Sequence, residues 1–109
     1  MSALDPEVAR SLAADLPHDV FVSIVRTFEQ DLARLVREMV EAAKVSNEDG
    51  YRRAAHGLAG AAGSIGAKRL EALAREAMRY DDVMPPAQRL RDIGAEARAA
   101  LTELAALSA

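Results

Sequence analysis

One long apolar repeat does most to limit what this chain of 109 residues can fold into. Between about residues 18 and 45, apolar side chains recur at intervals of three or four positions, at Phe21, Val25, Phe28, Leu32, Leu35, Met39 and Ala43. An α-helix turns once in about 3.6 residues, so this spacing places them on one face of a long amphipathic helix. That face has to be buried, and in so short a chain the other elements must pack along it.

The rest of the sequence predicts further helices rather than strands. Half of the residues are hydrophobic but only 4% are aromatic, and the abundant alanine and leucine favour helix. Shorter apolar stripes, bounded by capping residues, proline and glycine, predict helices over residues 5–16, 47–64, 67–80 and 86–107. Short connections make neighbouring helices antiparallel. We therefore expect an all-α fold, an antiparallel up-down four-helix bundle with a short extra N-terminal helix, in a single domain spanning residues 1–109.

Charge and composition argue against several classes of protein. A net charge of −3 provides no basic surface for nucleic acid, and the absence of cysteine excludes disulfides and thiolate metal sites. No apolar run approaches the roughly 20 residues that cross a bilayer, and the N-terminus lacks the features of a signal peptide. We expect a cytoplasmic, monomeric protein that binds neither nucleic acid nor membrane. The starting methionine and the compact length favour a free-standing protein.

Two acidic pairs, Glu48-Asp49 and Asp81-Asp82, are the remaining candidates for binding a metal ion. Both fall in or next to predicted connections between helices, where acidic residues commonly cap a helix or keep a loop solvated. We interpret them as capping and solubility charges and expect no metal site in this chain.

His56 is the residue that most suggests chemistry. On a helical wheel of about 100° per residue, Leu58 and Ile65 fall on the side opposite His56, which should face the core. The residues on its own side are Arg52, Arg53, Ala59, Gly60 and Gly63. We therefore expect the imidazole to stand in solvent, midway along a helix, among two arginines and residues with almost no side chain.

The glycines around His56 carry a cost in stability. Each glycine inside a helix destabilises it by about 1 kcal/mol relative to alanine, and this helix holds Gly57, Gly60 and Gly63. Close packing between helices also selects small residues, but Gly60 and Gly63 lie on the histidine side and not on the core side. Clearance for an incoming partner surface explains these two glycines better. A lone surface histidine, by contrast, is most often only a solvated residue.

The run His56-Gly57-Leu58-Ala59-Gly60, followed by small residues and Gly66, closely resembles the histidine phosphotransfer (HPt) family. The resemblance is sharpest over residues 52–73, and the helical layout extends it across most of the chain. It implies a phosphoryl carrier that works between the aspartates of receiver domains, in response regulators or hybrid histidine kinases. His56 would be the phospho-acceptor, and Mg²⁺ would sit on the receiver. The resemblance implies no cofactor, nucleotide site or kinase activity of its own, so we expect no enzyme.

The chain departs from the family pattern at two positions. The family usually carries a lysine three residues after the histidine, where this chain has Ala59, and some members carry a glutamine where ungapped counting places Met78. We hypothesise that Arg53 partly replaces the lysine as a phosphate-stabilising residue, with Arg52 less well placed. The surface that docks the partner is expected to include Ala59, Gly60, Gly63, Lys68 and Arg69.

Two other functions are compatible with the sequence. A helical interaction module could keep the bundle and bind signalling partners without efficient phosphotransfer, and Ala59 is the feature that favours this alternative. The dimerisation domain of a histidine kinase is the second. It is disfavoured because the predicted bundle is complete within one chain and no ATP-binding part follows.

Overall fold

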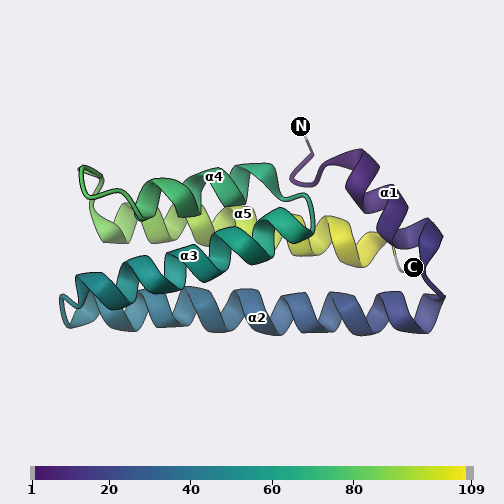
Figure 1. Ribbon diagram of the computed structural model, residues 1–109, viewed down its shortest axis with the longest axis horizontal. Coiled ribbons are helices and arrows are strands. Elements are labelled where there is room, and N and C mark those ends of the chain that lie inside the picture. The colour runs from purple at the N-terminus through teal and green to yellow at the C-terminus, as the bar shows by residue number, and fades with distance from the viewer. Residues whose placement is uncertain (1, 108–109) are drawn as a thin grey trace.

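The computed structural model describes residues 2–107, and every regular element within that range is a helix (Figure 1). The five helices are α1 (Pro6–Asp15), α2 (His18–Lys44), α3 (Glu48–Ser64), α4 (Lys68–Ala77) and α5 (Pro86–Ala106). Helices α2 and α4 each contact both α3 and α5, and α1 contacts α2 at one end of the molecule. The expected all-α fold is confirmed for the described residues.

The apolar repeat of the longest helix forms one wall of the core. On α2 the side chains of Phe21, Val25, Leu32, Leu35 and Met39 are buried, and Phe28 is half-buried at the edge of the core. The opposite walls come from residues that are completely buried on the other helices, Leu58, Leu70, Ile93 and Leu104. Each helix is therefore apolar on one side only. Within residues 2–107, none combines the length and the apolarity that crossing a lipid bilayer requires.

The helix ends form where the sequence provides the capping groups. The Asp5 carboxylate accepts a hydrogen bond from the Glu7 backbone N–H (2.9 Å) at the start of α1, and Asn47 Oδ1 accepts one from the Gly50 N–H (3.0 Å) at the start of α3. Gly66 follows α3 with φ +74°, in the left-handed region that glycine adopts most readily. The Asp5 N–H donates to the Gly66 carbonyl (2.7 Å), so the entry to α1 is fastened to the α3–α4 turn.

Helix α4 ends at Ala77, three residues before the expected boundary near residue 80, whereas every other boundary lies within one residue of its expected position. Beyond Ala77 the chain continues in single turns. The backbone N–H of Arg79 donates to the Glu76 carbonyl (3.1 Å), and the backbone N–H of Asp82 donates to the Arg79 carbonyl (3.2 Å). The helix stops here because Asp82 is drawn inward to a buried arginine on α5, a feature described below, and a continuous helix could not deliver it there.

Candidate functional site

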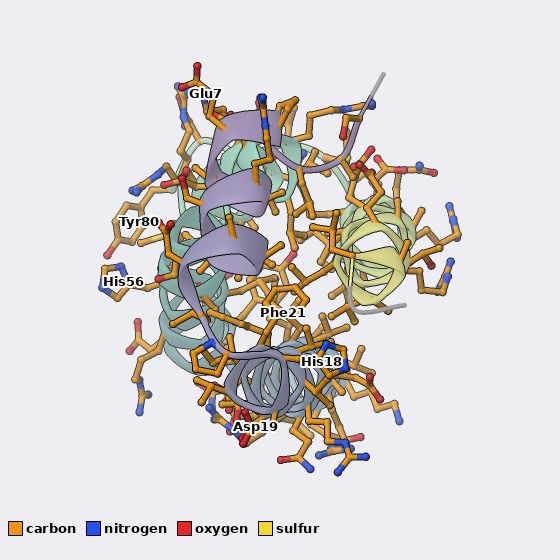
Figure 2. The ribbon with its side chains drawn as sticks, turned by 90° about the vertical axis from the view of Figure 1, so that its right-hand side faces the viewer. Glu7, His18, Asp19, Phe21, His56 and Tyr80 are labelled. Carbon is orange, nitrogen blue, oxygen red and sulfur yellow. The ribbon has the colours of Figure 1, made fainter. Side chains whose placement is uncertain are left out.

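His56 lies in the middle of α3 with its side chain exposed, as the helical wheel predicts. Figure 2, which looks along the bundle, shows the imidazole projecting outward from the molecule, on the same side as Tyr80, while Phe21 lies in the interior. No hydrogen bond or ion pair engages the imidazole within residues 2–107. The ring is therefore open to any molecule that approaches this side of α3.

The three glycines that follow His56 have different surroundings. A Cβ atom at Gly60 would meet no atom within 4 Å, so this position is open to solvent. At Gly63 a Cβ would lie 3.1 Å from Oε2 of Glu71, and at Gly57 it would lie 2.9 Å from Cδ2 of Leu35. Open space therefore surrounds Gly60, whereas Gly63 is partly covered by Glu71. Gly57 instead allows α2 to pack closely against α3.

Ala59 does not belong to the exposed side of α3, so its expected place in the docking surface is wrong. Its residue surface is 1% exposed, and Ala55 and Ala62, one turn before and one turn after it, are completely buried. The helical wheel assumed one apolar stripe opposite His56. Helix α3 packs against both α2 and α4, so its buried face is wider than one stripe and includes Ala59.

The two arginines before His56 are held differently. The Arg52 side chain is 21% exposed, donates to the Asp49 carboxylate (3.1 Å), and places its guanidinium 4.2 Å from the centre of the Tyr80 ring. Arg53 is exposed and forms no ion pair with any described residue. It borders a shallow hollow that Glu38 and Glu41 of α2 also line. Arg52 therefore faces α4, and Arg53 faces α2.

Lys68 and Arg69, the other two predicted docking residues, are both engaged within the chain. Lys68 Nζ lies 3.0 Å from the Asp5 carboxylate, and this contact lowers the pKa of Asp5 below its ordinary value. Arg69 lies 3.1 Å from Glu96 on α5. These pairs join the start of α4 to the cap of α1 and to α5, so a structural role accounts for both residues.

Sequence reasoning missed an ion pair that lies beside the open side of α3. Arg75 donates to Glu71 Oε2 from two of its nitrogens (2.8 and 3.3 Å), and the same oxygen approaches the position of a Cβ at Gly63. The spacing of four residues between an acidic and a basic residue on a helix was a signal that could have revealed the pair. The stacking of Tyr80 on Arg52 had no such signal, because it joins a connection to a helix far away in the sequence.

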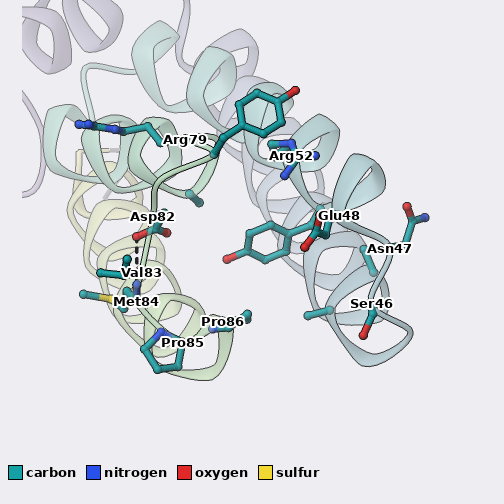
Figure 3. A pocket seen from close by; sticks show the side chains of 15 residues that line it. Ser46, Asn47, Glu48, Arg52, Arg79, Asp82, Val83, Met84, Pro85 and Pro86 are labelled. Carbon is teal, nitrogen blue, oxygen red and sulfur yellow. Dashed lines mark hydrogen bonds between the residues drawn. The ribbon is translucent and has the colours of Figure 1, made fainter.

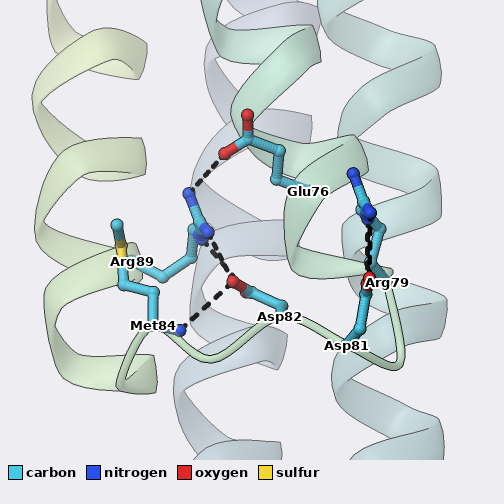
Figure 4. Close-up of polar contacts among 6 residues, drawn as sticks. All are labelled: Glu76, Arg79, Asp81, Asp82, Met84 and Arg89. Carbon is cyan, nitrogen blue, oxygen red and sulfur yellow. Dashed lines mark hydrogen bonds and ion pairs between the residues drawn. The ribbon is translucent and has the colours of Figure 1, made fainter.

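The interpretation of Asp81-Asp82 as solvated charges is only half right. Asp81 is exposed and pairs with Arg79 (2.9 Å), and each residue shifts the pKa of the other toward its charged form. Asp82 instead pairs with Arg89 (2.6 Å), whose side chain is only 4% exposed. The hydrogen bond from Arg89 is the main reason that the pKa of Asp82 lies below its ordinary value. Figure 4 shows Arg89 between Asp82 and Glu76.

A hollow of about 440 Å³ opens at the end of the bundle where the α4–α5 connection meets the α2–α3 turn (Figure 3). Tyr51, Arg52, Tyr80 and Asp82 are among the residues that line it. Burial raises the pKa of the Tyr51 hydroxyl above its ordinary value. Within residues 2–107 no group of three histidine, aspartate or glutamate side chains is close enough to hold a metal ion.

Comparison with known protein families identifies the class of this chain. Residues 23–109 match the family model described as the Hpt domain, so the chain belongs to the Hpt domain family, and the resemblance carried by the run at His56 is confirmed. Members of this family are phosphocarrier modules rather than enzymes, and they interact with receiver domains in phosphorelays. Comparison with curated proteins and with solved structures gave no match. Helix α1 lies before the matched residues.

Proposed function

We propose that this protein carries a phosphoryl group between the aspartates of receiver domains, as a transient phosphohistidine at His56. The observation that carries the proposal is the exposed imidazole without a partner in the middle of α3, with open space at Gly60 beside it. Membership of the Hpt family supports the same assignment. A receiver needs room to bring its aspartyl phosphate to the ring, and the side of α3 around Gly60 provides that room.

The proposed transfer requires little covalent chemistry from this chain. An unprotonated ring nitrogen of His56 attacks the phosphorus atom of the aspartyl phosphate, so that an N–P bond forms while the bond from phosphorus to the aspartate oxygen breaks. The aspartate leaves as a carboxylate, and the other ring nitrogen keeps its proton. Return to a second receiver reverses these steps. Such transition states are loose, so positioning and charge neutralisation dominate, and the receiver would supply the Mg²⁺.

The proposal extends to the arrangement of the helices, the oligomeric state and the location of the protein. Helices α2 to α5 would form the antiparallel four-helix bundle of the family, and the contacts of α2 and α4 with both α3 and α5 support this arrangement. We further propose that the protein acts as a monomer in the cytoplasm. Its apolar core is enclosed within one chain, which supports a monomer. Complexes with receivers would be brief, so we expect small interfaces that bury less than about 1,200 Å².

The proposal is tested by incubating the protein with phosphorylated receiver domains and Mg²⁺ and measuring acid-labile phosphate on this chain. The only other histidine, His18, is exposed at the start of α2 and provides a matched control. We expect the wild type and His18→Ala to become labelled and His56→Ala to remain unlabelled. Label on His56→Ala would contradict the proposal. Receiver binding without label on the wild type would favour the interaction module that does not transfer phosphate.

A further inference from the structure

A phosphoryl group on His56 would place about 1.5 to 2 negative charges on the open side of α3. Such a group is bound best by a cation that donates charge-assisted hydrogen bonds, and a guanidinium can donate two in parallel. Ala59 offers only a buried methyl group. The charge therefore has to be met by an arginine or lysine from elsewhere in the chain or by the partner.

Most nearby cations are engaged away from the ring. Lys68 and Arg69 join α4 to α1 and α5, and Arg79 pairs with Asp81 in the connection after α4. The Arg52 guanidinium is held between Asp49 and the Tyr80 ring, toward the start of α3. Among the cations of α3, α4 and the connection after α4, these residues leave Arg53 and Arg75 as candidates.

Two contacts fix how α4 runs along α3. The Glu71 carboxylate reaches Gly63 near the end of α3, and the Tyr80 ring covers Arg52 near its start. The two helices therefore run in opposite directions, as Figure 1 also shows. Arg75 lies between Glu71 and Tyr80 in the chain, and His56 lies between Arg52 and Gly63. The stretch of α4 that contains Arg75 consequently lies alongside the stretch of α3 that contains His56.

The resting position of the Arg75 side chain places its charge near Gly63. Its guanidinium donates to Glu71 Oε2 (2.8 Å), the oxygen that would lie 3.1 Å from a Cβ at Gly63. Since side chains on α4 lean toward the start of α4, Arg75 at rest leans away from His56 toward Gly63, and its long side chain has to turn back to reach the imidazole. Neither Gly60 nor Gly63 has a side chain to stand between the guanidinium and the imidazole. The Arg75 side chain is itself 62% exposed, so no packing prevents it from changing its rotamer.

We propose that Arg75 leaves Glu71 and binds the phosphoryl oxygens when His56 is phosphorylated. This inference rests on the proposed function of His56 and assigns the residue that stabilises the phosphorylated state. In the free protein the Glu71 carboxylate holds the Arg75 guanidinium close to α3. The phosphoryl group then replaces Glu71 as its partner, because that group carries more charge and more acceptor oxygens than a carboxylate. Arg53, on the α2 side of His56, has no residue that holds it in place among those described.

The test uses the intact protein loaded with phosphate from phosphoramidate, a small donor that requires no receiver, and follows the phosphohistidine by ³¹P NMR. A guanidinium beside the phosphoryl group disfavours the protonated form of the phosphohistidine, so we expect the midpoint of the phosphohistidine titration to rise by about one pH unit in Arg75→Ala. Arg75→Lys should restore part of the shift. Arg79→Ala, which removes a similarly exposed arginine from the connection after α4, should titrate as the wild type does.

The outcomes separate the inference from the proposed function. A wild-type protein that forms no phosphohistidine, or one that carries it equally in His56→Ala, contradicts the proposed function and with it the inference. Phosphohistidine that forms at His56 but titrates identically in the wild type and in Arg75→Ala overturns the inference alone. If Arg75→Ala loses its helical circular-dichroism spectrum, the inference is tested instead by the titration of Arg75→Lys and by the ¹⁵N signal of Arg75 Nε in the wild type. That signal should shift on phosphorylation of the wild type, and an unmoved signal also overturns the inference.

Discussion

The guanidinium of Arg89 is buried against the carboxylate of Asp82, to which it donates two hydrogen bonds (2.6 and 3.2 Å), and a third nitrogen donates to Glu76 (2.8 Å). The contact joins α5 to the connection that follows α4 (Figure 4). Tyr80 lies in the same connection, two residues before Asp82, and covers Arg52. A buried ion pair far from His56 in the sequence thus helps to shape the surface beside it.

Removal of the Asp82 carboxylate is expected to destabilise the protein. In Asp82→Asn the buried Arg89 keeps Glu76 but loses its closest ionic partner, and we expect a loss of about 2 kcal/mol in the free energy of unfolding. Urea denaturation at neutral pH measures the change. Asp81→Asn is the matched control, because Asp81 is exposed and its ionic partner among the described residues is the exposed Arg79. Equal stability of the two variants would show that the Arg89–Asp82 pair contributes little.

The same pair predicts a dependence of stability on pH. Arg89 lowers the pKa of Asp82 in the folded protein below its ordinary value, so the folded state favours the ionised carboxylate. Its contribution is complete above the pKa of an unfolded aspartate, about 3.9, and is lost as the pH falls through the lower folded value. The difference in unfolding free energy between the wild type and Asp82→Asn should therefore be constant between about pH 5 and 8 and shrink below about pH 4. A difference that grew on acidification would contradict this sign.

Two glycines of α3 are expected to respond differently to alanine. A Cβ at Gly60 meets open space, so Gly60→Ala should stabilise the helix by about 1 kcal/mol. A Cβ at Gly57 would lie 2.9 Å from Leu35, so Gly57→Ala should gain less or destabilise the protein. Thermal unfolding of the two variants measures the contrast.

Gly60 also tests the clearance of the proposed docking surface. Gly60→Gln should keep the fold, because the added side chain enters solvent, yet it should slow phosphotransfer from a receiver by at least about tenfold through a steric clash. Loading from phosphoramidate, which needs no docked protein, is the control and should be unaffected. Unchanged transfer from the receiver in Gly60→Gln would refute the idea that glycine is needed for access.

Local patterns in the sequence predicted the helices and the exposed histidine because each depends on residues close together in the chain. The apolar repeat from Phe21 to Met39 and the caps at Asp5 and Asn47 are signals of this kind. His56 was predicted by the same reasoning, since its exposure follows from its position on one helix.

The errors arose where a second helix determines the outcome. Ala59 was assigned to the surface because a helical wheel contains no neighbouring helix, and α3 packs against two. The buried pair of Arg89 and Asp82 joins residues seven positions apart across a helix start, a spacing with no local pattern. The early end of α4 follows from that pair. The position of Arg75 likewise depends on how α4 lies against α3.

Gly66 is expected to tolerate no side chain. Its φ of +74° is unfavourable for other residues, and a Cβ there would lie 2.9 Å from Cβ of Val8 and 3.1 Å from Cβ of Asp5. We expect Gly66→Ala to lower the free energy of unfolding by about 2 kcal/mol, from backbone strain together with displacement of α1. Chemical denaturation measures the loss. Gly94→Ala, where the nearest atom is the end of the Arg98 side chain at 3.5 Å, is the control and should be stable.

Tyr80 is expected to contribute more to partner binding than to stability. The residue is 87% exposed, and its side chain projects from the same side of the molecule as His56 (Figure 2). Its contact with Arg52 holds that guanidinium in one place, and such exposed contacts are worth about 0.5 to 1 kcal/mol. Tyr80→Ala should therefore lower the unfolding temperature by only a few degrees but bind a receiver about threefold to tenfold more weakly, because aromatic and arginine side chains dominate many interfaces. Tyr80→Phe keeps the ring and should bind normally. Val20→Ala, which trims an exposed apolar residue near the start of α2, should also bind normally. Titration calorimetry with a receiver distinguishes these cases, and equal affinities for Tyr80→Ala and the wild type would exclude Tyr80 from the interface.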